Sequence, residues 1–296
     1  MSRAFDVIQV DAFTEIPLQG NPCAILPDAG TLSDDEMQAI AREMNLSETS
    51  FVLESDLADF RCRYFTPAQE IPLAGHPTIA TVHALLELGR IAPGTKKVTI
   101  ELPAGMIGVE IREGGTTPWI VMTQLKPEFG RRLNRGELAT ALRVPESGMR
   151  ADVPVQVVST GTPQLMVPLT SLTALENAKP DAARAVELQA KGGFFSLHAF
   201  TQETLEPESA AHSRHWAAST TGLFEDPVTG SASGGMISYM LQYGLIEPGS
   251  HRLEQGDMMQ RPGRVEAEVE FLPDGSVAPP KIGGRAETVL RGSIQI

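Results

Sequence analysis

The sequence predicts an α+β protein of two pseudo-symmetric domains, each a curved, barrel-like mixed β-sheet around a central α-helix. Three observations favour this fold: an internal repeat, a predominance of strand-like segments, and two helices that are apolar on nearly every face. The length of 296 residues also fits two domains, at roughly 100–200 residues for each.

The internal repeat relates residues 70–94, EIPLAGHPTIATVHALLELGRIAPG, to residues 225–249, EDPVTGSASGGMISYMLQYGLIEPG. The two segments align without a gap and are identical at eight of 25 positions. A shorter match relates residues 20–27, GNPCAILP, to residues 161–168, GTPQLMVP. Solenoid repeats are much shorter than this spacing, so the repeat indicates two domains of one fold.

The local elements follow the same order in both halves. In the first half, Ser33 and Glu36 form a predicted capping box at the start of a helix. The predicted elements of that half are strands at 7–10 and 23–26, the helix to about residue 44, and strands at 50–53 and 60–65. Those of the second half are strands at 153–158 and 164–167, a helix near 181–191, and a strand at 194–200. Glycine, threonine and proline cluster at 112–120 and indicate a domain boundary there, giving domains 1–118 and 119–296.

The helix that follows each glycine-rich loop has no polar face. Residues 79–88 and residues 236–243 are apolar nearly all round. A helix of this kind is stable in water only when it is buried on all sides. We therefore expect each half to wrap its sheet around one of these helices.

Composition excludes several classes of partner. The chain carries 24 Lys and Arg against 37 Asp and Glu, a formal net charge of −13, which disfavours nucleic acid and anionic membrane surfaces. No 18-residue apolar run and no signal-peptide pattern occur, so we expect a cytoplasmic protein. The two cysteines, Cys23 and Cys62, lie far apart in apolar runs and are expected to be reduced core residues.

The two glycine-rich loops are candidate anion sites. Residues 72–78 and 227–235 each open a central helix, where backbone amides are unpaired and the helix dipole is positive. If the halves face each other, both helix starts converge on one cleft between the domains. A small carboxylate is the ligand that such a cleft would bind.

The polar side chains on the two loops differ. The first loop carries His76, whose repeat-equivalent is Ser231, and the second carries Asp226, whose equivalent is Ile71. An asymmetric substrate requires this kind of asymmetry. Ordinary alternatives stay open, because Asp226 suits a turn or helix N-cap and His76 suits a helix start.

Glu48 precedes an apolar strand in NLSETSFVL and is a candidate general acid or base if its environment is buried. Local sequence by itself favours an exposed loop glutamate at this position. The pair His212 and His215 resembles a metal pair, but no cysteine or carboxylate cluster accompanies it, so a surface loop is favoured and no metal site is expected. The sequence contains no nucleophile elbow, GxGxxG or Walker motif.

The ordered motifs NLSETSF, EIPLAGHPT and EDPVTGSASG resemble those of the PhzF family of phenazine-biosynthesis-like proteins. The opening segment VDAFTEIPLQGNPCAIL is also similar to that family's N-terminus. The resemblance implies the two-domain fold of diaminopimelate epimerase, a homodimer and no cofactor. A characterised family member isomerises trans-2,3-dihydro-3-hydroxyanthranilate by moving a proton between ring carbons.

The resemblance also implies roles for individual residues. Glu48 corresponds to the family's proton-transferring glutamate, and His76, Asp226 and Ser231 fall on its other active-site positions. Epimerase and racemase relatives use one cysteine on each glycine-rich loop, whereas both loops here lack cysteine. A carboxylate-based proton transfer is therefore expected in place of a two-thiol mechanism.

The expected mechanism places the substrate carboxylate on backbone amides near Gly75 and Gly230, with Thr229 and Ser231 as further binding residues. Two alternatives remain at this point. One is an epimerase or lyase on the same fold, and the other is a non-catalytic protein that binds a small carboxylate.

Overall fold

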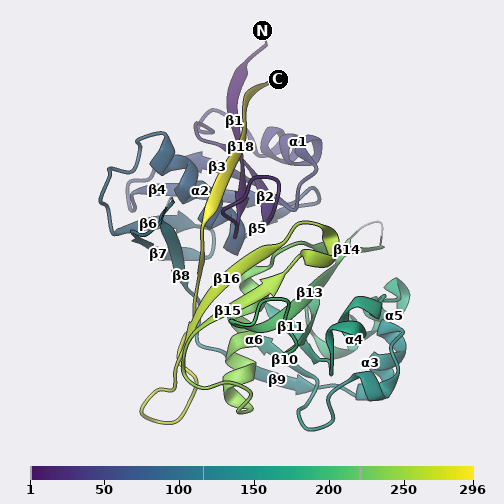
Figure 1. Cartoon of the computed structure of the whole chain (residues 1–296). Coiled ribbons are helices and arrows are strands. Elements are labelled where there is room, and N and C mark those ends of the chain that lie inside the picture. The colour runs from purple at the N-terminus through teal and green to yellow at the C-terminus, as the bar shows by residue number, and fades with distance from the viewer. Residues whose placement is uncertain (1, 116, 220–221) are drawn as a thin grey trace. The chain divides into compact units, whose positions relative to one another are not determined.

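The computed structural model describes residues 2–115, 117–219 and 222–296. The chain folds as two units, residues 1–122 with 283–296, and residues 123–282. Residue 116, inside the predicted boundary segment, lies outside the described part. The final strand falls within the predicted domain 119–296, but it pairs with the first strand of the chain. Figure 1 shows these two strands side by side.

The first unit is a mixed sheet with two helices, α1 (Asp34–Met44) and α2 (Gly75–Glu87). Its strands are β1 (Ala4–Ala12), β2 (Asn21–Leu26), β3 (Glu48–Leu53), β4 (Phe60–Phe65), β5 (Glu70–Ile71), β6 (Lys97–Leu102), β7 (Gly105–Arg112), β8 (Trp119–Thr123) and β18 (Ala286–Gln295). They lie in the order β18-β1-β2-β3-β4-β6-β7-β8, in which β2–β3 and β4–β6 are the parallel pairs.

The second unit repeats this topology. Its strands are β9 (Glu128–Arg132), β10 (Gln156–Ser159), β11 (Pro163–Pro168), β12 (Ser196–Thr201), β13 (Ser209–Ser219), β14 (Gly222–Asp226), β15 (Gly249–Gln255) and β16 (Gly263–Val269), with β17 (Lys281–Gly284) at the boundary. The order is β9-β10-β11-β12-β13-β15-β16, and the parallel pairs β11–β12 and β13–β15 recur at the same places. The pseudo-symmetry that the repeat predicted is therefore present in the strand order of the two units.

The helices of the second unit are α3 (Arg135–Leu142), α4 (Leu172–Asn177), α5 (Ala182–Gly192) and α6 (Gly230–Gln242), with short 3-10 turns at Glu146–Gly148 and Asp257–Met259. The sequence predicted α5 and α6 but not α3 or α4. In α3 the apolar residues are mostly alanine and leucine in a segment of only eight residues, which is too short to give a clear period.

The central helices are buried as expected. Helix α2 packs against β1, β2, β3 and β18, and α6 packs against β10, β11 and β16. Residues 76–85 of α2 and 232–241 of α6 are buried without interruption. The two helices have the same length and lie 155 residues apart, which is the offset of the sequence repeat. Each half thus places the start of a buried helix at its glycine-rich loop.

Other predicted elements are confirmed with small shifts. Ser33 caps α1 in a complete capping box with Glu36, and Met37 and Ile40 on that helix pack into the first unit's core. Burial of each of these side chains stabilises the fold by roughly 1.5–3 kcal/mol. Cys23 and Cys62 are fully buried and unpaired, as expected.

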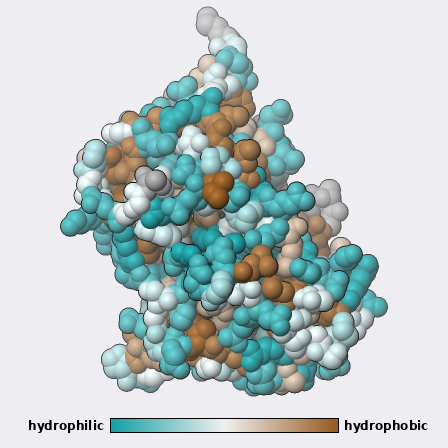
Figure 2. All heavy atoms as spheres, in the orientation of Figure 1, coloured by the Kyte–Doolittle hydropathy of each residue, from teal (hydrophilic) through white to brown (hydrophobic). Residues whose placement is uncertain are grey.

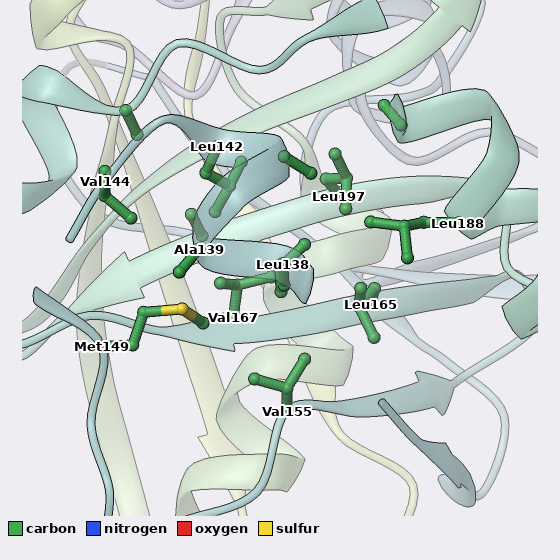
Figure 3. Packing of buried hydrophobic residues seen from close by; sticks show 14 of the residues in the cluster. Leu138, Ala139, Leu142, Val144, Met149, Val155, Leu165, Val167, Leu188 and Leu197 are labelled. Atoms are coloured by element: carbon green, nitrogen blue, oxygen red, sulfur yellow. The ribbon is translucent and has the colours of Figure 1, made fainter. Parts of the chain in front are cut away.

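A separate core in the second unit packs α3 on its sheet. Figure 3 shows Leu138 and Leu142 of α3 near Leu165 of β11 and Leu197 of β12, with Leu188 of α5 closing the cluster. This core packs against β11 and β12, which pair with β10 and β13. Figure 2 shows that hydrophilic residues predominate on the face in view, with hydrophobic ones interspersed, as expected of a chain with a large acidic excess. No helix in the described part of the chain is long and apolar enough to cross a membrane.

Candidate active site

Glu48 and His76 lie together in the first unit. Glu48 is the first residue of β3, and His76 is the second residue of α2. The imidazole Nε2 lies 3.3 Å from the carboxylate Oε2, with the Glu48 side chain 19% exposed and that of His76 6% exposed. The local expectation of an exposed loop glutamate is therefore wrong. The parallel pairing of β2 with β3 draws Glu48 into the sheet, a long-range contact that the local sequence does not carry.

His76 is held from its other side by β2. The side-chain nitrogen Nδ2 of Asn21 lies 3.2 Å from Nδ1 of His76, and both residues are buried. Burial lowers the pKa of His76 to about 3, against a smaller opposing effect of a backbone hydrogen bond with Pro22. The imidazole is therefore neutral at physiological pH, and its approach to Glu48 is a contact between a carboxylate and a neutral ring.

This pair can exchange a proton with a substrate. A part-exposed carboxylate is able to accept a proton from carbon, and the neutral ring beside it has one N–H to donate and one nitrogen to accept. His76 lies in the first turn of α2, where the helix dipole has its positive end. Its N-cap residue, Ala74, supplies no side-chain hydrogen bond, so backbone amides near Gly75 and His76 are not satisfied by a side-chain cap.

Asp226 lies in the second unit, just before the glycine-rich loop that opens α6. It is the last residue of β14, is 8% exposed, and accepts a hydrogen bond from the hydroxyl of Thr229. Thr229 is the N-cap residue of α6, but its side chain bonds to Asp226 and not to the helix. Its amide donates to Oε1 of Gln255 at 3.1 Å. The polar groups of Thr229 thus support Asp226, while its predicted role in substrate binding stays a prediction.

Ser231 is the second residue of α6 and occupies the position of His76 in the repeat. Its hydroxyl oxygen accepts a hydrogen bond of 3.1 Å from Nε2 of Gln164 on β11. A hydroxyl that accepts in this way has its own proton directed elsewhere, which suits donation to an anion. The carbonyl of the preceding Gly230 accepts from Nε2 of Gln124 at 2.9 Å, so the first turn of α6 is tied to the segment that follows β8.

Sequence reasoning missed Asn21, Gln164 and Gln255. Asn21 and Gln164 lie in the shorter repeat, GNPC and GTPQ, so the repeat itself marked both segments without indicating their contacts. No local signal marks Gln255, because its contacts with the turn before α6 arise only from the packing of β15.

The expectation that His212 and His215 lie in a surface loop is wrong. Both are buried in β13, which pairs with β12, β14 and β15. His212 Nδ1 lies 2.8 Å from Oε2 of the buried Glu254, and Nδ1 of His215 lies 3.2 Å from Nδ1 of His198. An internal strand can carry these polar residues because each finds a partner on a neighbouring strand. Within the described residues, no group of three or more His, Cys, Asp or Glu could hold a metal ion.

The fold defines a protein of the epimerase-like α+β class. The fold is similar to that of a hydroxyproline epimerase from Agrobacterium vitis, with a TM-score of 0.66, 13% identity, and coverage of 99% of this chain and 91% of that one. At this identity the likeness concerns the fold alone.

The chain belongs to the PhzC-PhzF family of phenazine biosynthesis-like proteins, whose pattern matches residues 10–292. A crystal structure of a PhzF-family phenazine biosynthesis protein from Bacillus anthracis is 33% identical, with a TM-score of 0.91 over 99% of this chain and 100% of the other. The uncharacterised isomerase YfhB of Bacillus subtilis is 38% identical over 89% of this chain and 90% of its own. Trans-2,3-dihydro-3-hydroxyanthranilate isomerase of Pseudomonas chlororaphis is 32% identical over 96% of this chain and 97% of its own length. The protein is therefore an isomerase of this family.

Proposed function

We propose that the protein is a cofactor-independent isomerase that moves a proton between two carbons of a small, cyclic amino or hydroxy carboxylic acid. The contact of Glu48 with the buried, neutral His76 is the observation that carries the proposal. The family membership and the name of the Pseudomonas chlororaphis relative support the same reaction class. Homodimerisation, expected from the family, and a cytoplasmic location, expected from the sequence, belong to the proposal as well.

Glu48 is the proposed base that removes the proton from carbon and returns it at a second carbon. Its carboxylate is partly exposed, so a substrate can reach it, whereas His76 behind it is buried. Because His76 is neutral, its contact with Glu48 is not a salt bridge between two charged groups. The ring nitrogen Nε2 faces the Glu48 carboxylate and is the atom placed to share the proton that Glu48 carries.

The start of each central helix is a proposed carboxylate-binding group, taken within its own unit. Backbone amides near Gly75 and Gly230 and the hydroxyl of Ser231 supply hydrogen-bond donors, and the helix dipoles favour an anion. The same donors stabilise the negative charge that develops when the C–H proton leaves. Asp226, supported by Thr229, is proposed to accept a hydrogen bond from the amine or hydroxyl group of the substrate.

A two-thiol mechanism is not supported by the two cysteines. Cys23 and Cys62 lie on β2 and β4, not on the glycine-rich loops, and both are fully buried. Burial raises the pKa of the Cys62 thiol to about 12 and that of Cys23 well above its usual range, so neither forms a thiolate readily. Acid–base chemistry by carboxylate therefore fits the chain better than chemistry by sulfur.

Deuterium uptake from D2O, followed by proton NMR, tests the proposal. The first probe is trans-2,3-dihydro-3-hydroxyanthranilate, followed by a panel of cyclic and allylic amino and hydroxy acids. A proton that returns to a different carbon identifies an isomerase, whereas inversion at one carbon identifies an epimerase. Glu48→Gln is expected to lower the rate by about 10²–10⁴-fold, the usual contribution of a positioned acid or base.

The matched control is Glu54→Gln, which removes an exposed carboxylate just beyond the other end of β3. This variant is expected to retain the wild-type rate. A Glu48→Gln variant within a few-fold of wild type would exclude Glu48 as the base, and binding of the panel without uptake would favour a carboxylate-binding protein.

A further inference from the structure

Gln255 is a buried residue that reaches the turn between β14 and α6. It is the last residue of β15 and is 1% exposed. Its amide Nε2 donates to the backbone carbonyl of Asp226 at 2.8 Å and to the hydroxyl of Thr229 at 3.2 Å. Its Oε1 accepts from the backbone amide of Thr229 at 3.1 Å. One side chain therefore contacts both ends of the turn.

These contacts continue to the carboxylate of Asp226. The Thr229 hydroxyl oxygen accepts from Gln255, and its single proton is donated to Oδ2 of Asp226. A hydroxyl has only one proton, so acceptance from Gln255 helps to direct that proton at the carboxylate. The result is an oriented chain of hydrogen bonds from Gln255 through Thr229 to Asp226.

Gln255 itself is held rigidly. Strand β15 pairs with β13 through Ser213 and with β16 through Gly263 at this position. Oε1 of Gln255 also lies 3.5 Å from the Ser213 hydroxyl, a weak contact. A group fixed by strands on both sides is a firm anchor for a turn that lies outside the sheet.

The next residue, Gly256, brings the backbone close to the same turn. It has a φ of +93°, and a Cβ at this position would lie 2.7 Å from the carbonyl oxygen of Pro227 and 2.2 Å from that of Arg261. Only glycine permits this approach. The Gln255–Gly256 step therefore packs against the turn through its backbone as well as through its side chain.

We propose that Gln255 is a positioning residue that holds the turn 226–229 and thereby aims the Asp226 carboxylate at the substrate. Glutamine suits this task because one planar group both donates to Asp226 and Thr229 and accepts from the Thr229 amide. Methionine has a similar length but cannot make these hydrogen bonds, and glutamate cannot donate when ionised. The inference rests on the proposed role of Asp226 in the reaction.

The first experiment needs no substrate. Hydrogen-exchange mass spectrometry is applied to peptides that cover residues 224–231 in wild type and in Gln255→Met. Loss of the hydrogen bond to the Thr229 amide is expected to speed exchange in this segment by about 3- to 10-fold, the free energy of one hydrogen bond, with little change elsewhere. Unchanged exchange in this segment, or faster exchange throughout the second unit, would overturn the proposal.

Gln156→Met is the matched control. Gln156 is also buried and donates to the carbonyl of Gly130 at 2.9 Å, while accepting from the hydroxyl of Tyr243. Neither of these hydrogen bonds involves the turn 226–229, so the substitution is expected to leave exchange in residues 224–231 unchanged.

The second experiment measures deuterium uptake for the single and double variants of Gln255 and Asp226. Gln255→Met is expected to lower kcat by about 10- to 100-fold, the effect of a group displaced by about 1 Å, with KM within about threefold of wild type. In an Asp226→Asn background, the same change is expected to have almost no further effect, because Gln255 acts through Asp226. Additive losses would show a structural effect alone and would overturn the proposal.

Thr229→Val serves as a second variant if Gln255→Met folds poorly. It removes the hydroxyl link but keeps the hydrogen bond between Gln255 and the carbonyl of Asp226, and it should lower kcat in the same way. If Asp226→Asn has wild-type activity, the proposed role of Asp226 fails. The exchange experiment then still decides whether Gln255 holds the turn.

Discussion

Replacing His76 by glutamine is expected to make the folded protein less sensitive to mild acid. The wild-type His76 side chain is buried, and burial lowers its pKa from an ordinary 6.5 to about 3. The unfolded chain therefore binds a proton at pH 5 that the folded chain does not. Since stability rises with pH wherever the unfolded state binds more protons, wild type loses stability as the pH falls below 6.5.

The size of the effect follows from the two pKa values. A shift of this size corresponds to about 5 kcal/mol in favour of the neutral ring in the folded state. Between pH 7 and pH 5 the titration of the unfolded histidine alone lowers the free energy of unfolding by about 2 kcal/mol. His76→Gln removes this contribution, so its loss of stability over the same range is expected to be about 2 kcal/mol smaller than that of wild type.

The assay combines urea unfolding at pH 7 and pH 5 with an NMR titration of the histidine rings, in which the His76→Gln spectrum assigns the His76 signal. His215 is an internal comparison, because burial also lowers its pKa to about 3. The ring signal of His76 is expected not to titrate above pH 4.5. A transition above pH 6.5 would refute the reasoning, since it would mean that the Glu48 carboxylate, 3.3 Å away, stabilises the imidazolium more than burial disfavours it. In that case wild type would gain stability on acidification relative to the variant.

Two further predictions concern stability. Glu254→Gln is expected to destabilise the protein by about 3–5 kcal/mol in urea unfolding, because the buried carboxylate of Glu254 accepts from the amides of Leu205 and Glu206 and pairs with His212. The control Glu266→Gln, whose partner Arg252 is 36% exposed, should change stability by less than about 1 kcal/mol, and equal losses would contradict the argument. Gly20→Ala is expected to lower stability by at least about 2 kcal/mol, since Gly20 has a φ of +63° and a Cβ would lie 2.1 Å from the carbonyl oxygen of Ala12. Gly94→Ala, with a φ of +79° and open space around it, should lower the free energy of unfolding by the conformational effect alone, about 1 kcal/mol, so a similar loss in both variants would rule out the clash.

Much of the fold was predictable because its signals are local or repeated. The capping box of Ser33 and Glu36, the all-apolar helices and the repeat spacing of 155 residues each have a direct counterpart in the structure. The pairing of β18 with β1 was not predictable in this way, because strands 200 or more residues apart carry no local mark of their partner. His212 and His215 were misplaced for a related reason, since a polar segment reads as a loop until its partners on other strands are known.

The sequence by itself determined the class of protein and the identity of its candidate residues. Its repeat established two related halves, and its motifs singled out Glu48, His76, Asp226 and Ser231. Tertiary structure decided the environments of these residues, because burial and hydrogen bonding depend on segments distant in the chain. The pairing of β2 with β3 and the packing of α2 bring Glu48 to His76 and keep the ring neutral, and the packing of β15 brings Gln255 to the turn that carries Asp226.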